Sequence, residues 1–370
     1  MSFSQSTYEG RVKSLQRLMD ERGIDALAIL DIENYHYFTG DFRKQPRLYI
    51  PKLGEPLLIV FKGEEEEVSK SSWIKRIKTY TNMHEMMVSV IEWIKENEIK
   101  TIGFNFDFSL PAFLIERFKL ANPSVKVMDA TELCMELRMV KLNQELELIK
   151  KAAEIAINGM EAVREILKEG MKEYEVVGEI EYAMRKKGAE RFAFPTFVNS
   201  GYRSNWLHGI ATRKEIKKEE LILIDIGPVY RGYCADMTRM FIIGSPNDEQ
   251  KKLLETYIKI RNAAVDVARP GKRIMDLDNA AQKALGGTDY SQHYVRGIAH
   301  GIGLAFEEKP FPTIFPEDSV IELKPNMTIS IGHSILSIPK IAGARVEDVF
   351  LITDEGAKKF VEYPEHLISV

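Results

Sequence analysis

Two aspartates have the clearest chemical potential in this sequence, because they interrupt apolar runs in residues 221–241. Asp225 stands between two isoleucines, and Asp236 precedes the second run. We predict an antiparallel hairpin with its turn centred between Tyr230 and Arg231, which would place the two aspartates directly opposite each other on one sheet face. Opposed carboxylates in an apolar setting need a cation or a shared proton. A divalent metal ion meets that need, and two exposed, unrelated strand-end aspartates are the alternative.

Three further segments contain residue types that bind metals or handle protons. His300 lies among glycines that permit close approach of backbone or ligand, although a lone histidine is more often a hydrogen-bonded core residue. Arg345 and Glu347 are two positions apart in a predicted strand and so share one face, where an ion pair is the ordinary interpretation. His208 follows the glycine-bearing loop 199–201 and resembles a substrate-facing histidine.

The segments that must position these residues indicate an α+β fold class in two domains. In residues 1–139, helical spacing alternates with short apolar strands at 25–30, 57–61 and 101–104, as expected for an α/β domain. In residues 140–370, the order helix, glycine, helix, strands occurs twice, which predicts an internally duplicated α+β domain. The predicted helices of this second domain begin near residues 143, 173, 248 and 275.

Composition excludes several classes of partner. The 370 residues carry 51 Lys and Arg against 55 Asp and Glu, which gives a formal charge of −4. The excess of positive charge that attracts nucleic acid is therefore absent from the composition, and nucleic acid is not an expected partner. The polar start is unlike a signal peptide, and no apolar run reaches the roughly 18 residues of a membrane span. Cys134 and Cys234 are far apart in the sequence. We therefore expect both cysteines to be unpaired, small, buried side chains. We also expect a cytoplasmic protein.

Taken together, these segments resemble in order and spacing the pita-bread metallopeptidases, which include prolidase, aminopeptidase P and methionine aminopeptidase, and the related creatinase. Residues 225–239 match D-x-G-x-x-x-x-G-Y-x-[SA]-D-x-T-R at every fixed position. Residues 34–40 resemble N-x-x-Y-[LF]-T-G, and Lys141 with Glu145 resembles the K-x-x-x-E that opens the catalytic domain. The resemblance implies a creatinase-type amino-terminal α/β domain followed by a pita-bread domain.

The resemblance also implies a site. It implies a pair of manganese, cobalt or iron ions that clamp the attacking oxygen and the scissile carbonyl. Four of the five family ligand positions are occupied here, by Asp225, Asp236, His300 and Glu347.

Further roles and partners follow from the same resemblance. His208 falls on a histidine that binds substrate beside the metals, and Arg345 and Thr238 fall on residues that support the ligand cluster. The implied substrate is a proline-containing dipeptide or short peptide, and the implied assembly is a homodimer.

Two positions depart from the family. Glu307 stands where the family has a catalytic histidine, and Gly332 stands where it has the fifth ligand, a glutamate that is also the expected general base. The second ion should therefore bind more weakly and peptidase activity should fall, unless the carboxylate of Glu307 reaches the metals. His333 is a poorer substitute, because adjacent strand residues point to opposite faces unless a bulge intervenes.

Three functions remain open at this point. The first is a proline-specific metallopeptidase with an altered cluster of two ions, one ion or none, for which Gly332→Glu with Glu307→His should raise turnover. The second is a metal-independent hydrolase of a small substrate, as in creatinase. The third is a binding protein that has kept the fold and lost the chemistry.

Overall fold

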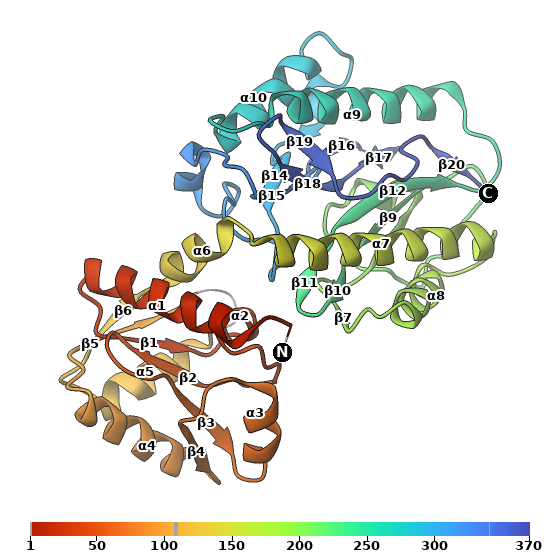
Figure 1. The fold of residues 1–370 in the computed structure, drawn as a ribbon. Coiled ribbons are helices and arrows are strands. Elements are labelled where there is room, and N and C mark those ends of the chain that lie inside the picture. The colour runs from red at the N-terminus through yellow and green to blue at the C-terminus, as the bar shows by residue number, and fades with distance from the viewer. Residues whose placement is uncertain (1, 107–109, 340) are drawn as a thin grey trace. The chain divides into compact units, whose positions relative to one another are not determined.

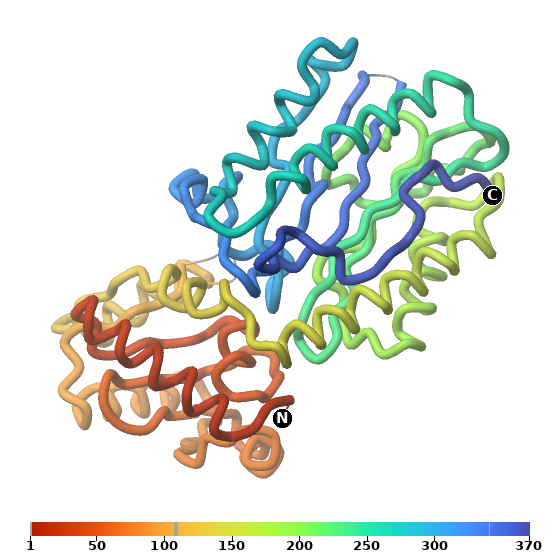
Figure 2. The backbone as a smooth tube through the Cα atoms, turned by 45° about the horizontal axis from the view of Figure 1, so that its top comes forward, coloured from red at the N-terminus to blue at the C-terminus, as the bar shows by residue number. Residues whose placement is uncertain are grey.

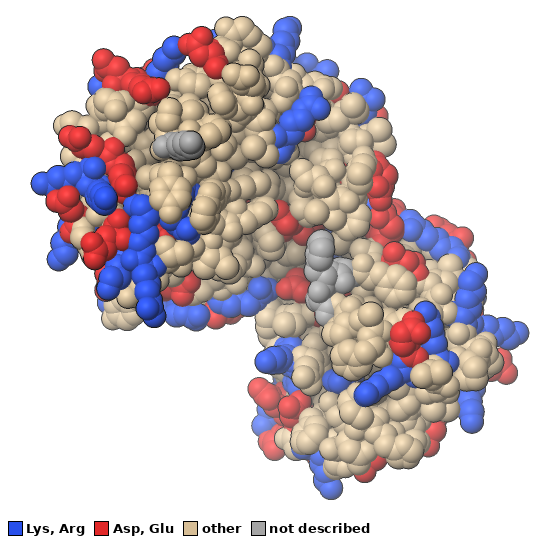
Figure 3. Space-filling model, turned by 180° about the vertical axis from the view of Figure 1, so that it is seen from behind, with Lys and Arg blue, Asp and Glu red and all other residues tan. Residues whose placement is uncertain are grey.

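The computed structural model describes residues 2–106, 110–339 and 341–370 (Figure 1). By its internal contacts the chain divides into two compact units, Met1–Arg138 and Met139–Val370, here called the amino-terminal and carboxyl-terminal units. Within the described ranges, no helix is both long and apolar enough to cross a bilayer. Acidic and basic side chains are interspersed over the face drawn in Figure 3, as the nearly balanced composition predicts.

The described part of the amino-terminal unit is built on a six-stranded sheet with the order β4-β3-β2-β1-β5-β6. Its strands are β1 (Ala26–Ile29), β2 (Leu48–Pro51), β3 (Leu57–Phe61), β4 (Ile77–Tyr80), β5 (Thr101–Phe104) and β6 (Lys126–Asp129). Its helices are α1 (Gln5–Glu21), α2 (Ile32–Thr39), α3 (Glu65–Ser71), α4 (Met83–Glu96), α5 (Ala112–Ala121) and α6 (Thr131–Met139). The three strands predicted from sequence are confirmed as β1, β3 and β5.

The described part of the carboxyl-terminal unit contains four long helices and several short sheets. The helices are α7 (Asn143–Ile166), α8 (Glu173–Lys186), α9 (Asp248–Val267) and α10 (Ile274–Leu285), with short 3-10 turns η1 (Gly201–Asn205), η2 (Ser291–His293) and η3 (Pro316–Val320). The strands are β7 (Arg191–Phe192), β8 (Phe197–Ser200), β9 (Leu221–Ile226), β10 (Pro228–Tyr230), β11 (Tyr233–Cys234), β12 (Met237–Ile242), β13 (Tyr294–Val295), β14 (Ala299–Gly301), β15 (Thr328–Ile331), β16 (Ile335–Ile338), β17 (Ala342–Ala344), β18 (Asp348–Ile352), β19 (Ala357–Lys359) and β20 (Ile368–Ser369).

The predicted duplication is visible in how the helices cover the sheets. Residues of α7 and α8 share a core with the sheet β20-β12-β9-β8. Residues of α9 and α10 share a second core with the sheet β14-β15-β18-β19. Figures 1 and 2 show the two helix pairs on opposite sides of the strands. The duplicated α+β architecture is therefore confirmed, and the four long helices begin within one residue of the predicted starts.

The hairpin that carries Asp225 has a different register from the predicted one. In the pairing of β9 with β12, Thr238 lies opposite Asp225. The turn is formed by Arg231 and Gly232, whose φ angles are 47° and 88°. Two consecutive residues with positive φ are typical of a type I′ turn, for which glycine is well suited.

The predicted turn between Tyr230 and Arg231 was therefore wrong, and so was the direct pairing of Asp225 with Asp236. Moving the turn centre by one residue shifts every pairing by two positions. Because side chains alternate with a period of two, the shift leaves Asp236 on the same face as Asp225, as a diagonal neighbour. The inference that the two carboxylates meet survives the error in register.

A buried network of ion pairs holds the strand that follows Glu347. Arg239 Nη2 lies 2.7 Å from Asp348 Oδ1, and Arg261 Nη1 lies 3.4 Å from Asp348 Oδ2. Arg261 also pairs with Glu365 in the last segment of the chain. The network therefore ties β12, α9 and the carboxyl-terminal segment to β18, and fixes the backbone beside Glu347.

We predict that Glu365→Gln lowers the free energy of unfolding at pH 7 by on the order of 1 to 2 kcal/mol, a value reduced for partial exposure. Partial burial raises the pKa of Glu365, but Arg261 and Lys359 outweigh it and lower the pKa to about 2. The stabilisation is thus present above the ordinary glutamate pKa and is lost as the pH falls toward 2. Denaturant unfolding at several pH values should show the difference from wild type shrinking below about pH 4.5.

Glu362→Gln is the matched control, because Glu362 also lies 3.4 Å from Lys359 Nζ but its side chain is 83% exposed. It should change the free energy of unfolding by less than about 0.5 kcal/mol. A Glu365→Gln effect that persists undiminished at pH 3 would contradict the assignment.

Candidate metal centre

A pocket of about 290 Å³ in the carboxyl-terminal unit collects most of the predicted site residues. Its polar lining consists of His208, Asp225, Asp236, Glu307, His333 and Arg345. Glu347 and His300 are buried beside it, with 0% and 1% exposure. Segments that are far apart in the sequence therefore meet at one place.

Three carboxylates form the floor of the cluster. One oxygen from each of Asp225, Asp236 and Glu347 lies within 4.8 Å of the others, and the three residues are at most 3% exposed. Thr238 supports this arrangement, because its Oγ1 donates to Glu347 Oε2 over 3.3 Å and its backbone bridges to Glu347. Strand β9 thus carries Asp225, and Asp236 and Glu347 directly precede β12 and β18.

His300 adds a nitrogen to the carboxylate cluster. It lies on β14 opposite Ser330, with its Nε2 3.6 Å from Glu347 Oε1 and 3.7 Å from Asp236 Oδ2. Its Nδ1 lies 3.0 Å from the carbonyl oxygen of Gly301, to which it can donate. That hydrogen bond leaves the lone pair of Nε2 facing the carboxylates, as a metal ligand requires.

Two buried carboxylate oxygens and one imidazole nitrogen of this cluster are unsatisfied. Asp225 Oδ1, Asp236 Oδ1 and His300 Nε2 have no hydrogen-bond partner among the described residues. Leaving buried polar atoms unsatisfied is costly, and two oxygens with one imidazole nitrogen are donors that divalent cations accept. The residues present therefore fit a divalent metal ion.

Arg345 supplies positive charge inside the cluster. Its Nη1 lies 3.1 Å from Asp225 Oδ2, and its Nη2 pairs with Glu347 Oε2. The side chain is 1% exposed, and the expected common face of Arg345 and Glu347 is observed. A guanidinium therefore already neutralises part of the carboxylate charge.

The pKa values of the three buried carboxyl groups are shifted in different directions. Burial raises the pKa of Asp225 to about 6, against the opposing charge of Arg345. Burial and the charges of Glu347 and Asp225 raise the pKa of Asp236 well above its usual range. Burial also acts to raise the pKa of Glu347, but Arg345 and the histidines outweigh it and hold that pKa well below normal. The cluster is short of positive charge, which a bound cation would supply.

His333, which the sequence rated a poorer substitute for the missing glutamate, lies within the cluster. Strand β15 ends at Ile331, and Gly332 has a φ of 129°, so the alternation of side chains is interrupted. His333 turns inward, with its Nδ1 3.7 Å from Glu347 Oε1 and its Nε2 3.6 Å from Glu307 Oε1. The sequence left open whether a bulge would turn His333 inward, and the backbone at Gly332 provides that interruption.

The backbone at Gly332 also argues against the expectation that Gly332→Glu, made together with Glu307→His, would raise turnover. A Cβ at this position would lie 2.6 Å from the Cα of Glu347 and even closer to the carbonyl oxygen of Val346. Gly332→Glu is therefore incompatible with the present backbone and is not expected to restore the family site.

His208 and Glu307 lie at the outer side of the cluster. Their candidate ligand atoms and that of His333 lie within 4.8 Å of one another, and His208 is exposed. Burial raises the pKa of Glu307. Burial and the charge of Arg345 lower the pKa of His208, which makes its ring neutral at pH 7. These two side chains can therefore exchange protons or hydrogen bonds with a molecule in the pocket.

A buried carboxylate holds the loop that carries His208. Glu173 Oε1 accepts from the backbone nitrogen of Ser200 over 2.9 Å, and Glu173 Oε2 accepts from that of Thr212 over 3.0 Å. Arg203 Nε lies 2.9 Å from Glu173 Oε2. Glu173 therefore fixes both ends of the loop to α8.

The start of α7 holds two other site segments. Lys141 Nζ lies 2.9 Å from Glu308 Oε1, and both side chains are 2% exposed. Tyr233 Oη donates to Glu145 Oε1 over 2.6 Å. The K-x-x-x-E pattern thus anchors the residue that follows Glu307 and the strand that precedes Asp236.

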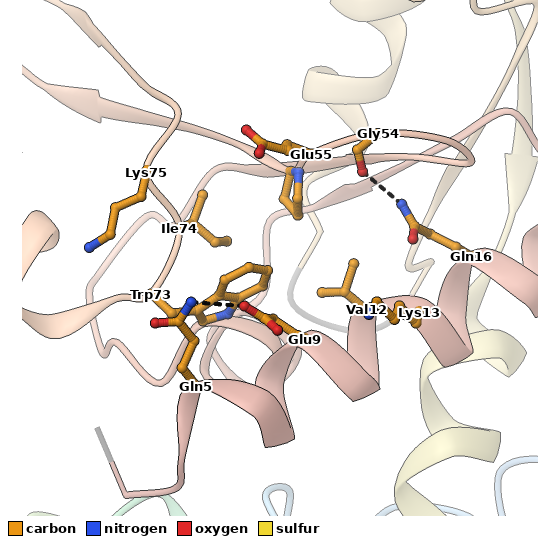
Figure 4. A pocket seen from close by; sticks show the side chains of 11 residues that line it. Gln5, Glu9, Val12, Lys13, Gln16, Gly54, Glu55, Trp73, Ile74 and Lys75 are labelled. Carbon is orange, nitrogen blue, oxygen red and sulfur yellow. Dashed lines mark hydrogen bonds between the residues drawn. The ribbon is translucent and has the colours of Figure 1, made fainter.

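A second hollow of about 350 Å³ lies in the amino-terminal unit (Figure 4). Residues of α1 line one side of it, where Gln5 Nε2 donates to Glu9 Oε1 over 2.8 Å and Gln16 Nε2 donates to the Gly54 carbonyl over 3.0 Å. Trp73 also lines it. No histidine belongs to its described lining, so the chemistry predicted from sequence belongs to the carboxyl-terminal unit.

Comparisons with known proteins agree with this assignment. Residues 147–354 match the model of metallopeptidase family M24, and residues 11–140 match that of the creatinase/prolidase amino-terminal domain. The chain is 32% identical to an Xaa-Pro dipeptidase of Pyrococcus furiosus over 97% of this chain and 99% of that protein. The prolidase structure from Pyrococcus horikoshii superposes with a TM-score of 0.88 at 32% identity, covering 97% of this chain and all of that one. The X-Pro aminopeptidase structure from Thermotoga maritima gives 0.85 at 28% identity, covering 97% and 99%.

We predict that Glu173→Gln destabilises the protein by about 3 kcal/mol, because it leaves the buried Arg203 without its charge partner. Amide hydrogen exchange in residues 200–212 should accelerate more than in the sheet strands. Glu175→Gln, at an exposed position of the same helix where the carboxylate accepts only from Lys172 over 2.8 Å in the described structure, is the matched control. Unchanged protection of the amides of residues 200–212 in Glu173→Gln would contradict the role of Glu173 in holding this loop.

Proposed function

The chain belongs to metallopeptidase family M24, and from that membership we propose that it is a metal-dependent Xaa-Pro hydrolase, either a dipeptidase or an aminopeptidase. The family resemblance read from the sequence is confirmed. The observation that carries the proposal is the convergence of three unsatisfied buried atoms, on Asp225, Asp236 and His300, at the floor of a pocket.

We assign the metal-holding role to Asp225, Asp236, His300 and Glu347. A bound divalent ion polarises the scissile carbonyl as a Lewis acid. Oxygen-rich donors with imidazole suit manganese, cobalt or iron, which are the metals we propose. The unsatisfied oxygens and the orientation of the His300 ring support the assignment.

An apolar wall suits the proline ring. Phe194 lies 5.4 Å from Phe197 and 5.4 Å from Phe306, measured between ring centroids, and all three line the pocket. Gly227 leaves space for this wall, because a Cβ there would lie 2.5 Å from the Phe194 ring. We propose that the three rings exclude water from the side of the pocket that receives proline.

Two side chains are placed to handle protons and orient the peptide. A neutral His208 can donate a hydrogen bond to a substrate carbonyl or carboxylate from the exposed side of the pocket. Glu307 replaces the family histidine, and its Oε1 is the atom that we propose accepts a proton from the attacking water. His333 Nε2, 3.6 Å away, can hold that carboxylate in place.

We include a cytoplasmic location and a homodimer in the proposal, as the sequence led us to expect. Both cysteines are buried, which suits a reducing compartment. The homodimer rests on the family resemblance alone.

We predict that the protein hydrolyses Ala-Pro and Met-Pro faster than Ala-Ala, and that removal of divalent ions by a chelator abolishes turnover until manganese or cobalt is restored. Asp225→Asn should reduce kcat/KM at least about 100-fold, since losing a group that only supports a metal ligand already costs 10- to 100-fold. Steady-state turnover with and without metal is the measurement.

Asp289→Asn is the matched control, because this carboxylate is 78% exposed and pairs with Lys252. It should retain full activity. Equal turnover of Ala-Ala and Ala-Pro would contradict the specificity, and chelator-resistant hydrolysis of creatine would instead support the creatinase-like alternative.

A further inference from the structure

The backbone on both sides of His333 is held by one tyrosine hydroxyl. Tyr257 Oη donates to the carbonyl oxygen of Gly332 and lies 2.6 Å from the carbonyl oxygen of Ser334. The hydroxyl oxygen of Ser334 lies 3.2 Å from the same Tyr257 Oη. Because the single phenolic proton is shared between the two carbonyls, the serine hydroxyl is the donor in this third contact. The two carbonyl groups that flank His333 therefore converge on one side chain.

Helix α9 brings Tyr257 to this position. The buried residues of the helix recur at helical spacing and form the face that packs on the core, and they are Leu253, Leu254, Tyr257, Ile260, Arg261 and Ala264. Burial raises the pKa of Tyr257 far above its ordinary value, so the hydroxyl keeps its proton and remains a donor at pH 7. One turn further along the same face, Arg261 pairs with Asp348, which directly follows Glu347. One helix thus fixes the segment of His333 and the segment of Glu347.

The amides of the same segment have a different partner. The backbone nitrogens of Gly332 and His333 both donate to the carbonyl oxygen of Ile298, over 2.7 Å and 3.2 Å. Ile298 directly precedes β14, the strand that carries His300. The donors of the segment are therefore held from β14 and its acceptors from α9, so the peptide groups around His333 have a defined orientation. The inward direction of the imidazole depends on both sets of hydrogen bonds.

The imidazole of His333 connects Arg345 with Glu307. Its Nδ1 lies 3.1 Å from Arg345 Nη2. Arginine can only donate, so Nδ1 is the acceptor, and the proton of the ring is on Nε2. Nε2 lies 3.6 Å from Glu307 Oε1 and presents its N–H to the carboxylate that we propose accepts a proton from the attacking water. The guanidinium therefore orients the ring at one nitrogen, and the ring offers a donor to Glu307 at the other.

We propose, building on the function proposed above, that Tyr257 is a positioning residue of the reaction. Its hydroxyl holds the backbone around His333, and His333 in turn holds the carboxylate of Glu307 where that carboxylate can accept a proton. Tyr257 is not among the described residues that line the pocket, so it acts through His333 and not by touching the substrate. Loss of the hydroxyl should therefore lower turnover without weakening substrate binding.

Tyr257→Phe removes the hydroxyl and keeps the ring. We expect kcat for Ala-Pro to fall about tenfold, as when a group that orients a site residue is lost, and KM to stay unchanged. Steady-state turnover at saturating metal is the measurement. Tyr290→Phe is the matched control, because Tyr290 is a buried tyrosine of the same core whose hydroxyl bonds to none of residues 332–334 in the described structure, and it should keep full kcat. Unchanged kcat in Tyr257→Phe, or a change confined to KM, would refute the positioning role.

A double-mutant cycle separates action through His333 from a general loss of stability. His333→Ala should lower kcat by itself, and Tyr257→Phe should lower it no further in that background, because the two residues act in one chain of contacts. An equal effect of Tyr257→Phe in both backgrounds would show that the hydroxyl acts independently of His333, and would overturn the proposal.

Nitrogen NMR of the full-length chain labelled with 15N-histidine gives a readout besides activity. In the wild-type chain we expect the His333 signals, assigned by their absence from His333→Ala, to show the proton on Nε2. A proton on Nδ1 would overturn the proposal, since Nε2 could then not donate to Glu307, and this result does not depend on the folding of Tyr257→Phe. In folded Tyr257→Phe the His333 signals should shift, while those of His36 and His84 in the amino-terminal unit should not. Unshifted His333 signals would refute the hold of Tyr257 on this residue.

The outcomes separate this proposal from the proposed function. Shifted His333 signals in Tyr257→Phe, without Xaa-Pro turnover in the wild-type chain, would refute the function and support the hold of Tyr257 on His333. Turnover in the wild-type chain with an additive double-mutant cycle would support the function and refute the positioning role.

Discussion

Burying three carboxylates beside one another carries a desolvation cost that only positive charge or protonation can offset. Asp225, Asp236 and Glu347 meet this constraint differently. Arg345 stabilises the charge of Glu347, while the pKa values of Asp225 and Asp236 rise. The cluster is thus held in a state that favours uptake of a cation, because an ion can replace protons on the aspartates without rearranging the strands that carry them.

Buried ion pairs hold several of the site segments from behind. Glu173 closes the loop of His208, Lys141 anchors the segment of Glu307 through Glu308, and the network around Asp348 fixes the strand after Glu347. Each of these pairs is buried, so removing one partner leaves a charge without compensation. This explains why residues that never face the pocket fall on the motifs that resemble the family.

Hydrophobic periodicity was sufficient to predict the α+β class and the repeat of helices and strands, whereas the set of candidate ligands came from the family resemblance. It failed where single residues set backbone geometry. The hairpin register depended on Arg231 and Gly232 accepting positive φ, and alternation alone cannot locate such a turn. The direction of His333 stayed open for the same reason, because strand alternation does not continue through Gly332. The ion pairs of Glu173 and Lys141 join residues distant in sequence, and no local pattern identifies such partners.

The loss of the family glutamate and the arrival of His333 are best understood as one change rather than two. With a φ of 129° and no space for a Cβ, residue 332 can only be glycine in this backbone, and the same backbone turns His333 toward Glu347. A glutamate restored at 332 would have to move the strand and would displace the imidazole that now fills the position. The backbone at Gly332 and the inward turn of His333 therefore depend on each other, so the site has to be understood from the residues present.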